Sequence, residues 1–367
     1  MKNVCIVLKK NVTSRDTGEC TIIDAFNLCG YVFQEIRFLL QSNEKKLKED
    51  LNLLKAECDN VLLLVDRTAL PIIKEYVLSS FPGFTQVSSF SNAGIYADGK
   101  CSLFLLSLDS SETGLGFVEN ACKPYLVKKS GVRFEQLVVR SVGANEEKIG
   151  ALLLEAERIS AGKIRITHHR KYCEDTIGIV YDSTTPKMLV DDVVRLFAEG
   201  LADTVYALND VSLEEQLVEI LKLRKKKISV AESFTGGGIA RRITSVSGAS
   251  AVYFEGLNTY DEKSKMKRLG VSDVGLRTVG AVSDQTAYEM ALGLLNTGDC
   301  DIAIATTGLA GPKSDRSMLP VGLCFIAVGT KEKVYVYRYK FDGDRTAITE
   351  KAINYALFTA FKQLKNI

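Results

Sequence analysis

The C-terminal part of the sequence carries hydroxyl groups and a lysine but no imidazole. The chain has only 2 histidines, His168 and His169, so residues 207–367 contain none. A hydrolase built from this part therefore has no Ser-His-Asp triad and no imidazole ligand for zinc. The remaining route is a hydroxyl nucleophile activated by a lysine or a tyrosine, and Tyr260 and Lys265 supply both groups. Such a lysine must be partly desolvated to accept a proton near pH 7.

This pair also has an ordinary structural explanation. Lys265 lies between two further lysines, Lys263 and Lys267, in a segment that is predicted to be a helix. It is then a surface lysine on a basic helix, and Tyr260 caps a core. On the pattern alone, this structural explanation is favoured over a catalytic one.

Two glycine-containing loops follow predicted strands. Ser-Phe-Thr-Gly-Gly-Gly at 233–238 opens a predicted helix, which places free N–H groups and hydroxyls at a natural anion site. The loop at 306–312, Thr-Thr-Gly-Leu-Ala-Gly-Pro, follows another buried strand. Two such loops at one edge of a sheet indicate a nucleotide-sized ligand. The alternative is a tight turn in which the glycines only relieve crowding.

Caps and periodicity predict the elements that position these loops. Ser212 and Glu215 form a capping box that opens a helix. Apolar runs and helix caps predict the other elements of the C-terminal domain. These are strands at 228–231, 252–260 and 301–307, helices at 261–270, 283–295 and 347–365, and a hairpin at 321–341.

The first 130 residues alternate strands with helices, which predicts a doubly wound α/β sheet. Buried strands are expected at 4–8, 60–65 and 101–108. The loops at 66–71 and 109–114 follow two of these strands without a glycine cluster. We therefore expect a structural or regulatory role for this domain.

Residues 131–206 are predicted to form a small α+β domain. Its adjacent histidines, His168 and His169, point to opposite faces of a strand and cannot bind one metal ion. The basic run at 168–171 is interpreted as a solvated edge of the sheet rather than a nucleic-acid patch. The chain is thus expected to contain three domains, 1–130, 131–206 and 207–367.

Composition excludes several classes of protein. The net charge of +2 argues against a protein that mainly grips nucleic acid. The 9 cysteines show no CxxC spacing, so they are expected to be reduced thiols in the cytoplasm rather than a metal site or disulfide framework. The first apolar run is too short for a signal peptide or a membrane span, and no later one reaches 18 residues, so no membrane partner is expected.

Six segments of the C-terminal domain resemble the CinA family. They occur in the family's order: AESFTGG (231–237), SVSGASAVYFEGLNTYDEKSKMKRLGV (245–271), VGAVSDQTAYEMALG (279–293), ATTGLAGP (305–312), PVGLCFIAV (320–328) and FDGDR (341–345). The resemblance implies an α/β amidase domain that hydrolyses nicotinamide mononucleotide to nicotinic acid mononucleotide and ammonia. It implies no metal and no cofactor. A homodimer is expected by family analogy alone.

The resemblance assigns roles to residues that match the family's motifs. It implies a catalytic set of Ser233, Ser250, Tyr260 and Lys265, and a substrate-binding set of Thr235, Gly236, Gly237, Thr307, Gly308 and Arg345. Lys265 is expected to be the base, but the choice of nucleophile between Ser250 and Ser233 stays open. Tyr260 is expected to donate or relay a proton, and Arg345 to clamp the ribose phosphate or the developing acid.

The sequence also departs from the family. Phe234 replaces a cysteine, Ala249 replaces a serine, and the loop after Pro312 lacks a glycine run. The first 206 residues resemble the molybdopterin-binding-type (MoCF-like) and KH-type domains of longer CinA proteins, but the ligand loops are replaced. We therefore expect a degenerate N-terminal domain without pyrophosphatase activity. The alternative for the whole chain is a catalytically silent nucleotide-binding regulatory protein.

Overall fold

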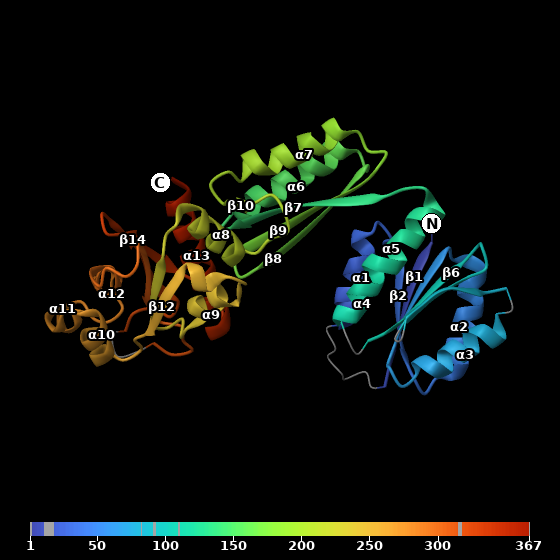
Figure 1. Ribbon diagram of the computed structural model, residues 1–367, viewed down its shortest axis with the longest axis horizontal. Helices are drawn as coiled ribbons and strands as arrows, with labels where there is room; N and C mark the ends of the chain where they lie inside the picture. The colour runs from blue at the N-terminus through green and yellow to red at the C-terminus, as the bar shows by residue number, and fades with distance from the viewer. Residues whose placement is uncertain are drawn as a thin grey trace. The chain divides into compact units, whose positions relative to one another are not determined.

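The computed structural model describes residues 2–10, 18–81, 83–90, 93–108, 111–314 and 318–366. Within these ranges the fold is mixed α/β with three sheets (Figure 1). The chain divides into two compact units, Met1–Gln136 with Val180–Lys187 and Leu137–Ile179 with Met188–Ile367. Most of the middle segment thus groups with the C-terminal segment, and the division into three domains stays a prediction.

The N-terminal unit contains a six-stranded sheet in the order β2-β1-β3-β6-β5-β4. Its strands are β1 (Asn3–Lys9), β2 (Glu35–Leu40), β3 (Asn60–Val65), β4 (Thr85–Phe90), β5 (Ala93–Ala97) and β6 (Ser102–Ser107). The pairs β1–β2, β1–β3 and β3–β6 are parallel, whereas β4 and β5 are antiparallel additions that the sequence did not predict. The predicted strands at 4–8, 60–65 and 101–108 are confirmed.

Helices cover both faces of this sheet, as the doubly wound prediction requires. Figure 1 shows α1 (Gly18–Leu28), α4 (Ser111–Phe117) and α5 (Lys123–Ser130) on one face and α2 (Glu44–Glu57) and α3 (Leu70–Ser80) on the other. A π-helical turn, Val118–Cys122, joins α4 to α5. The apolar stripe of α2, formed by Leu47, Leu51 and Leu54, is buried against the sheet.

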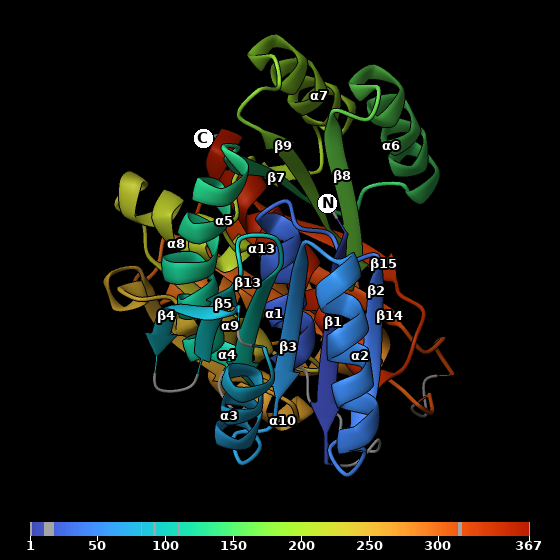
Figure 2. The same ribbon diagram turned by 90° about the vertical axis from the view of Figure 1, so that its right-hand side faces the viewer.

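A four-stranded sheet follows, in the order β10-β7-β9-β8. Its strands are β7 (Phe134–Val142), β8 (Ile164–Lys171), β9 (Glu174–Asp182) and β10 (Val205–Ala207). Figures 1 and 2 show α6 (Glu146–Ser160) and α7 (Lys187–Gly200) side by side on one face. His168 lies on the edge strand β8, as predicted, and its Nε2 atom is 2.9 Å from a carboxylate oxygen of Asp175.

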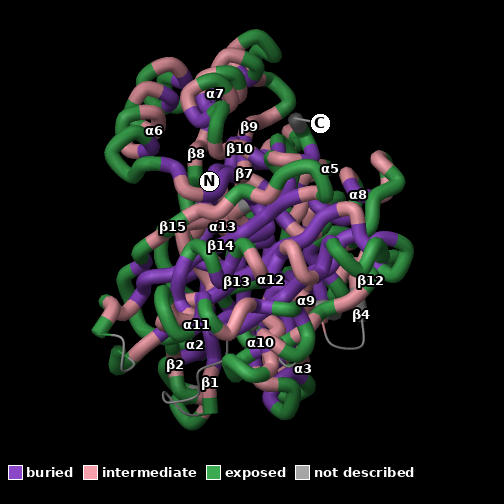
Figure 3. Tube along the Cα trace, turned by 90° about the vertical axis from the view of Figure 1, so that its left-hand side faces the viewer, coloured by how far each residue is buried: buried purple, intermediate pink, exposed green. Residues whose placement is uncertain are grey.

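The C-terminal sheet has five strands in the order β12-β11-β13-β14-β15. They are β11 (Ile228–Glu232), β12 (Tyr253–Asn258), β13 (Ile302–Gly308), β14 (Leu323–Thr330) and β15 (Val334–Lys340). β11 pairs in parallel with both β12 and β13, so the carboxyl ends of these strands share one edge of the sheet. Figure 3 shows β13 and β14 as buried strands at the centre of this domain.

Helices cover both faces of this sheet. The helices α8 (Leu213–Arg224), α9 (Gly238–Ser245) and α13 (Arg345–Asn366) pack on one face, and α10 (Glu262–Leu269), α11 (Asp273–Thr278) and α12 (Asp284–Asn296) on the other. The predicted capping box of Ser212 and Glu215 is confirmed, and Gly270 ends α10 in the left-handed conformation. Across the described ranges, no helix combines the length and apolar character that crossing a bilayer requires.

Candidate active site

Ser233 lies at the carboxyl end of β11, where the strand turns into α9. Its N–H donates to the carbonyl of Thr306 at 3.1 Å, which holds the serine beside the end of β13. The chain then turns through Gly236 and Gly237, whose φ angles of 62° and 92° lie in the left-handed region. Glycine adopts this region without a Cβ penalty, so the Thr-Gly-Gly sequence allows the sharp strand-to-helix turn.

Lys265 lies in α10, the helix that follows the neighbouring strand β12, and its side chain extends to Ser233. Asp261 caps this helix at its N-terminus by accepting from the N–H of Lys263. Lys265 follows in the first turn with its side chain only 1% exposed, so it is not the surface lysine of the structural explanation. Its Nζ atom lies 3.0 Å from the Ser233 hydroxyl oxygen. The structure therefore brings together a buried hydroxyl and a buried amine.

Two carbonyls fix the orientation of this amine. Lys265 Nζ donates to the carbonyl oxygens of Thr259 at 2.7 Å and Tyr260 at 3.2 Å. Carbonyl oxygens only accept hydrogen bonds, so both contacts consume N–H groups. When Lys265 is neutral, its two hydrogens serve these carbonyls and its lone pair is left for Ser233. The geometry thus directs the basic electron pair at the hydroxyl proton.

Burial lowers the pKa of Lys265, so that its neutral form is populated near physiological pH. Desolvation lowers the pKa of Lys265 from 10.5 to about 8, although the nearby carboxylates of Glu262 and Asp261 oppose this shift. Among the ion pairs of the described residues, none includes Lys265. A lysine with this pKa has a substantial neutral fraction at pH 7–8, as a general base needs.

Ser250 lies away from this pair. It belongs to a 3₁₀ turn, Ala249–Ala251, that precedes β12, and its side chain is exposed. The parallel pairing of Ile228 with Tyr253 places the start of β12 beside the start of β11. Ser250 is therefore at the amino edge of the sheet, whereas Ser233 is at the carboxyl edge, about 15 Å along the strands. The geometry pairs Lys265 with Ser233.

Tyr260 and Arg345 meet at the rim of the site. The Tyr260 side chain is 63% exposed, and its hydroxyl oxygen accepts from Arg345 Nη2 at 3.3 Å. Arg345 is the first residue of α13, and its Nη1 also donates to the carbonyl of Gly311 at 2.8 Å. The contact of Tyr260 with Lys265 is thus through its backbone carbonyl. Its predicted role in proton transfer stays a prediction.

The N-terminus of α9, which was predicted to bind a ligand anion, already binds a carboxylate of this chain. The buried side chain of Glu232 accepts from the N–H groups of Gly237, Ile239 and Ala240 at 3.1, 3.1 and 2.8 Å. The Gly236 N–H donates to the Ser233 carbonyl at 3.1 Å. Sequence reasoning missed Glu232, whose signal was an acidic residue between a buried strand and a helix start. Substrate binding by Gly236 and Gly237 stays a prediction.

Two threonines of the predicted substrate-binding set make internal hydrogen bonds. The hydroxyls of Thr235 and Thr306 lie 2.7 Å apart and join the two loops. Thr307 donates to the carbonyl of Ala281 at 2.6 Å, and Gly308 pairs with Cys324 in the sheet. These contacts stabilise the carboxyl edge around Ser233. Residues 315–317, in the loop after Pro312, lie outside the described residues.

Comparison with known proteins identifies the family of this α/β domain with its Ser–Lys pair. A family model described as the CinA C-terminal domain matches residues 210–364. Over 340 residues the chain is 31% identical to a CinA-like protein of Endomicrobium trichonymphae, and the alignment covers 82% of this chain and 78% of that protein. The chain therefore belongs to the CinA family.

Other relatives match a smaller part of the chain. A protein of Caldicellulosiruptor saccharolyticus that is named as competence-damage inducible is 37% identical over 246 residues, which is 66% of this chain and 60% of that protein. The chain thus spans less than two thirds of the length of several relatives that it matches. Among solved structures, the competence/damage inducible protein CihA from Agrobacterium tumefaciens is 35% identical, with a TM-score of 0.40 over 42% of this chain and 93% of that chain.

Proposed function

We propose that this chain is a nicotinamide-nucleotide amidase, which hydrolyses nicotinamide mononucleotide to nicotinic acid mononucleotide and ammonia. The observation that carries the amidase proposal is the 3.0 Å contact between the Ser233 hydroxyl and the buried amine of Lys265. The choice of nicotinamide mononucleotide rests on the resemblance of the motifs around these residues to the CinA family. Each step of the proposed reaction uses only groups of this chain and water.

The first half of the proposed reaction forms an acyl-enzyme. Neutral Lys265 removes the proton of Ser233 while the Ser233 oxygen attacks the amide carbonyl carbon. The tetrahedral intermediate then collapses, and the C–N bond breaks as the Lys265 ammonium returns its proton to the leaving nitrogen. Ammonia departs and the nicotinoyl group is left as an ester of Ser233.

The second half reverses these roles with water as the nucleophile. Water attacks the ester carbonyl while Lys265 accepts one of its protons. Collapse of this second intermediate returns the proton to the Ser233 oxygen and releases the carboxylic acid. The sum is one amide and one water converted to one acid and one ammonia, and the enzyme is regenerated.

Backbone N–H groups beside Ser233 are candidates for stabilising the oxyanion. Within the described part of the chain, the N–H groups of Phe234 and Thr235 donate to no protein acceptor. The N–H that follows a nucleophilic serine is a common donor to the tetrahedral oxyanion in acyl transfer. Phe234 itself is buried in the core, so its backbone is held in place by packing.

The rim supplies groups for the rest of the nucleotide. The exposed ring of Tyr260 offers a face on which a pyridine ring can stack. Arg345 adjoins this ring and carries a positive charge that suits a ribose phosphate. Thr307 and Gly308 stay proposed substrate contacts at the end of β13.

Ammonia release from nicotinamide mononucleotide tests this proposal. The full-length chain is expected to release one ammonia for each nicotinic acid mononucleotide formed, and Lys265→Ala is expected to lose this activity. Mass spectrometry of acid-quenched enzyme is expected to detect the nicotinoyl ester on Ser233. Absence of turnover in the unmodified chain would instead favour the catalytically silent nucleotide-binding protein.

We also propose that the N-terminal domain has no pyrophosphatase activity. The loop after β3 is an ordinary turn, in which an Asp66 carboxylate oxygen accepts from the N–H and hydroxyl of Thr68 at 3.0 and 2.7 Å. The corresponding residues Asp109 and Ser110 after β6 lie outside the described residues. ADP-ribose hydrolysis by the full chain would contradict this proposal.

A homodimer and a cytoplasmic location also stay predictions. Light scattering tests the homodimer, and cell fractionation tests the location.

A further inference from the structure

A cavity of about 780 Å³ lies on the other side of the C-terminal sheet from Lys265. It is bounded by β15, by α13 and by residues at the end of β7 and just before β10, all within the same compact unit. β15 is the edge strand, and β13 and β14 separate it from β11 and Ser233. The cavity faces α13, whereas Lys265 belongs to α10 on the opposite face. It is therefore distinct from the proposed active site.

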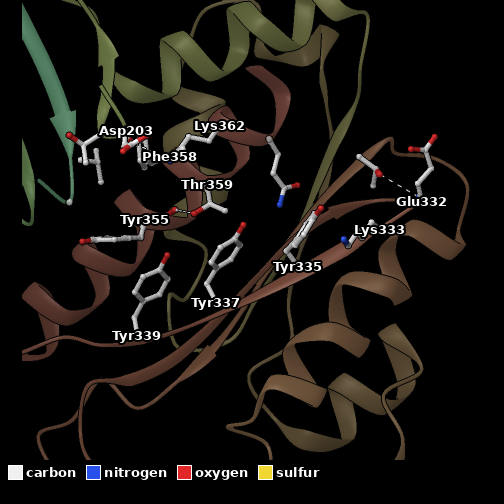
Figure 4. Close-up of a pocket in the computed structure, with 15 residues that line it drawn as sticks. Asp203, Glu332, Lys333, Tyr335, Tyr337, Tyr339, Tyr355, Phe358, Thr359 and Lys362 are labelled. Carbon is white, nitrogen blue, oxygen red and sulfur yellow. Dashed lines mark hydrogen bonds between the residues drawn. The ribbon is translucent and has the colours of Figure 1, made fainter. Parts of the chain in front are cut away.

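Aromatic side chains dominate one wall of this cavity. Tyr335, Tyr337 and Tyr339 alternate along β15 and so project from the same face of the strand. Figure 4 shows their rings standing in a row with their hydroxyls pointing toward α13. Tyr337 stacks on Tyr339 with ring centroids 6.4 Å apart, and Tyr339 packs against Tyr355 of α13 at 4.7 Å. The row is thus held rigid at one end.

At the open end of the tyrosine row, hydroxyl and amide groups are available to bind a ligand. Tyr335 is 43% exposed, and in the described part of the chain the hydroxyls of Tyr335 and Tyr337 have no hydrogen-bond partner. Gln363 donates to the carbonyl of Val328 at 3.0 Å, which leaves its amide oxygen to accept another donor. A ligand here meets an aromatic face together with several hydroxyl and amide groups.

Charges around the cavity balance. Its lining contains two lysines, Lys333 and Lys362, and two carboxylates, Asp203 and Glu332. Lys362 Nζ is already bonded to the carbonyl of Asp203 at 3.0 Å, and Lys333 Nζ lies over the Tyr335 ring at 4.6 Å. No excess of positive charge is available for a phosphate among these groups. The lining therefore suits an uncharged ligand.

We propose that this tyrosine cavity binds a nucleoside, a planar heterocycle that carries a hydroxylated sugar. The base stacks on the face of the Tyr335 ring that Lys333 does not cover, and the sugar hydroxyls bond to the tyrosine hydroxyls and to Gln363. Cavities that hold small molecules typically measure about 300–1,000 Å³, are lined by aromatic groups and carry a few polar groups that orient the ligand. The size and lining of this cavity meet that description.

Calorimetric titration of the full chain with adenosine tests the proposal. One adenosine is expected to bind per chain, and ribose alone is expected to bind at least about tenfold more weakly because it lacks the stacking base. Adenosine monophosphate is expected to bind no more tightly than adenosine. Because the chain has 14 tyrosines and no tryptophan, quenching of its tyrosine fluorescence gives a second readout.

Substitutions locate the bound adenosine. Tyr335→Ala is expected to weaken binding about tenfold or more, a change of about 1.4 kcal/mol, whereas Tyr335→Phe keeps the stacking face. Tyr288→Ala, an exposed tyrosine on α12, is the matched control and is expected to change nothing. Lys265→Met is expected to leave adenosine binding intact.

Several results would overturn the proposal. These are no binding at about 1 mM adenosine, unchanged binding in both Tyr335→Ala and Tyr337→Ala, or loss of binding in Lys265→Met, which would place adenosine in the active site. Tenfold tighter binding of adenosine monophosphate would also contradict an uncharged ligand. Tyr335 lies on an edge strand and is partly exposed, so its replacement leaves the core intact.

Discussion

The side-chain nitrogen of Lys265 lies 3.0 Å from the hydroxyl oxygen of Ser233, and the two residues come from different strand connections of one sheet. Ser233 follows β11, and Lys265 lies in α10 after β12. Since β11 and β12 run in parallel, both connections leave the sheet at the same edge. This pairing of strands is what brings a nucleophile and a base together.

The first prediction separates the two candidate nucleophiles. Ser233→Ala is expected to lower kcat for ammonia release by about 10³-fold or more, because it removes the attacking oxygen. Ser250→Ala is the matched control and is expected to stay within about threefold of the unmodified chain, since Ser250 lies at the opposite edge of the sheet. Equal losses in the two variants would contradict the assignment of Ser233.

The second prediction concerns the pH dependence of the reaction. Lys265 acts as a base only when neutral, and its pKa is lowered to about 8 by burial. Below this pKa the amine is protonated, so kcat/KM is expected to fall about tenfold for each pH unit. Above it, kcat/KM is expected to level off. A profile that is flat between pH 6 and about 9 would argue against Lys265 as the base.

The third prediction links Lys265 to stability. Its pKa is about 8 in the folded chain and about 10.5 when unfolded, so between these values the unfolded chain binds more protons. The free energy of unfolding of the unmodified chain is therefore expected to rise with pH across this window, relative to Lys265→Met. The total rise is about 3 kcal/mol, and the full penalty is present below pH 8.

Urea denaturation at several pH values measures this difference. Lys265→Met removes the charge but keeps a side chain of similar length, so the pH-dependent part of the comparison reports the buried amine. Lys267→Met, which replaces an exposed lysine on the same helix, is the control for removing a charge from α10. A constant difference between Lys265→Met and the unmodified chain would show that Lys265 titrates normally.

The fourth prediction concerns Glu232, which caps α9. Glu232→Gln keeps the size of the side chain but removes the charge that accepts three backbone N–H groups. We expect a loss of about 1–3 kcal/mol in the free energy of unfolding, because hydrogen bonds to a charged group are worth more than neutral ones. Glu219→Gln removes an exposed carboxylate on α8 and is expected to change stability by less than about 0.5 kcal/mol.

The fifth prediction concerns the rim of the site. Arg345→Ala is expected to raise KM for nicotinamide mononucleotide about 10- to 100-fold, since the proposed phosphate contact and the bond to Gly311 are both lost. Arg338→Ala removes an exposed arginine of β15 and is expected to leave KM unchanged. A similar KM in both variants would show that Arg345 does not bind the substrate.

Sequence alone predicted most elements of this fold because their signals are local. Periodicity gave the buried strands of both large sheets, and Ser212 with Glu215 gave the start of α8. The short helix α11 and the antiparallel strands β4 and β5 were not predicted. They are short segments whose structure depends on the neighbours they pack against.

Residue types by themselves determined the kind of chemistry available to this chain. Without a histidine in the C-terminal domain, a hydroxyl and a lysine were the remaining nucleophile and base. Only the tertiary structure decided which serine meets Lys265, because strand order and register set the distance between residues that are far apart in sequence. It also showed that Glu232 occupies the helix N-terminus, since the direction of a carboxylate depends on how β11 and α9 pack.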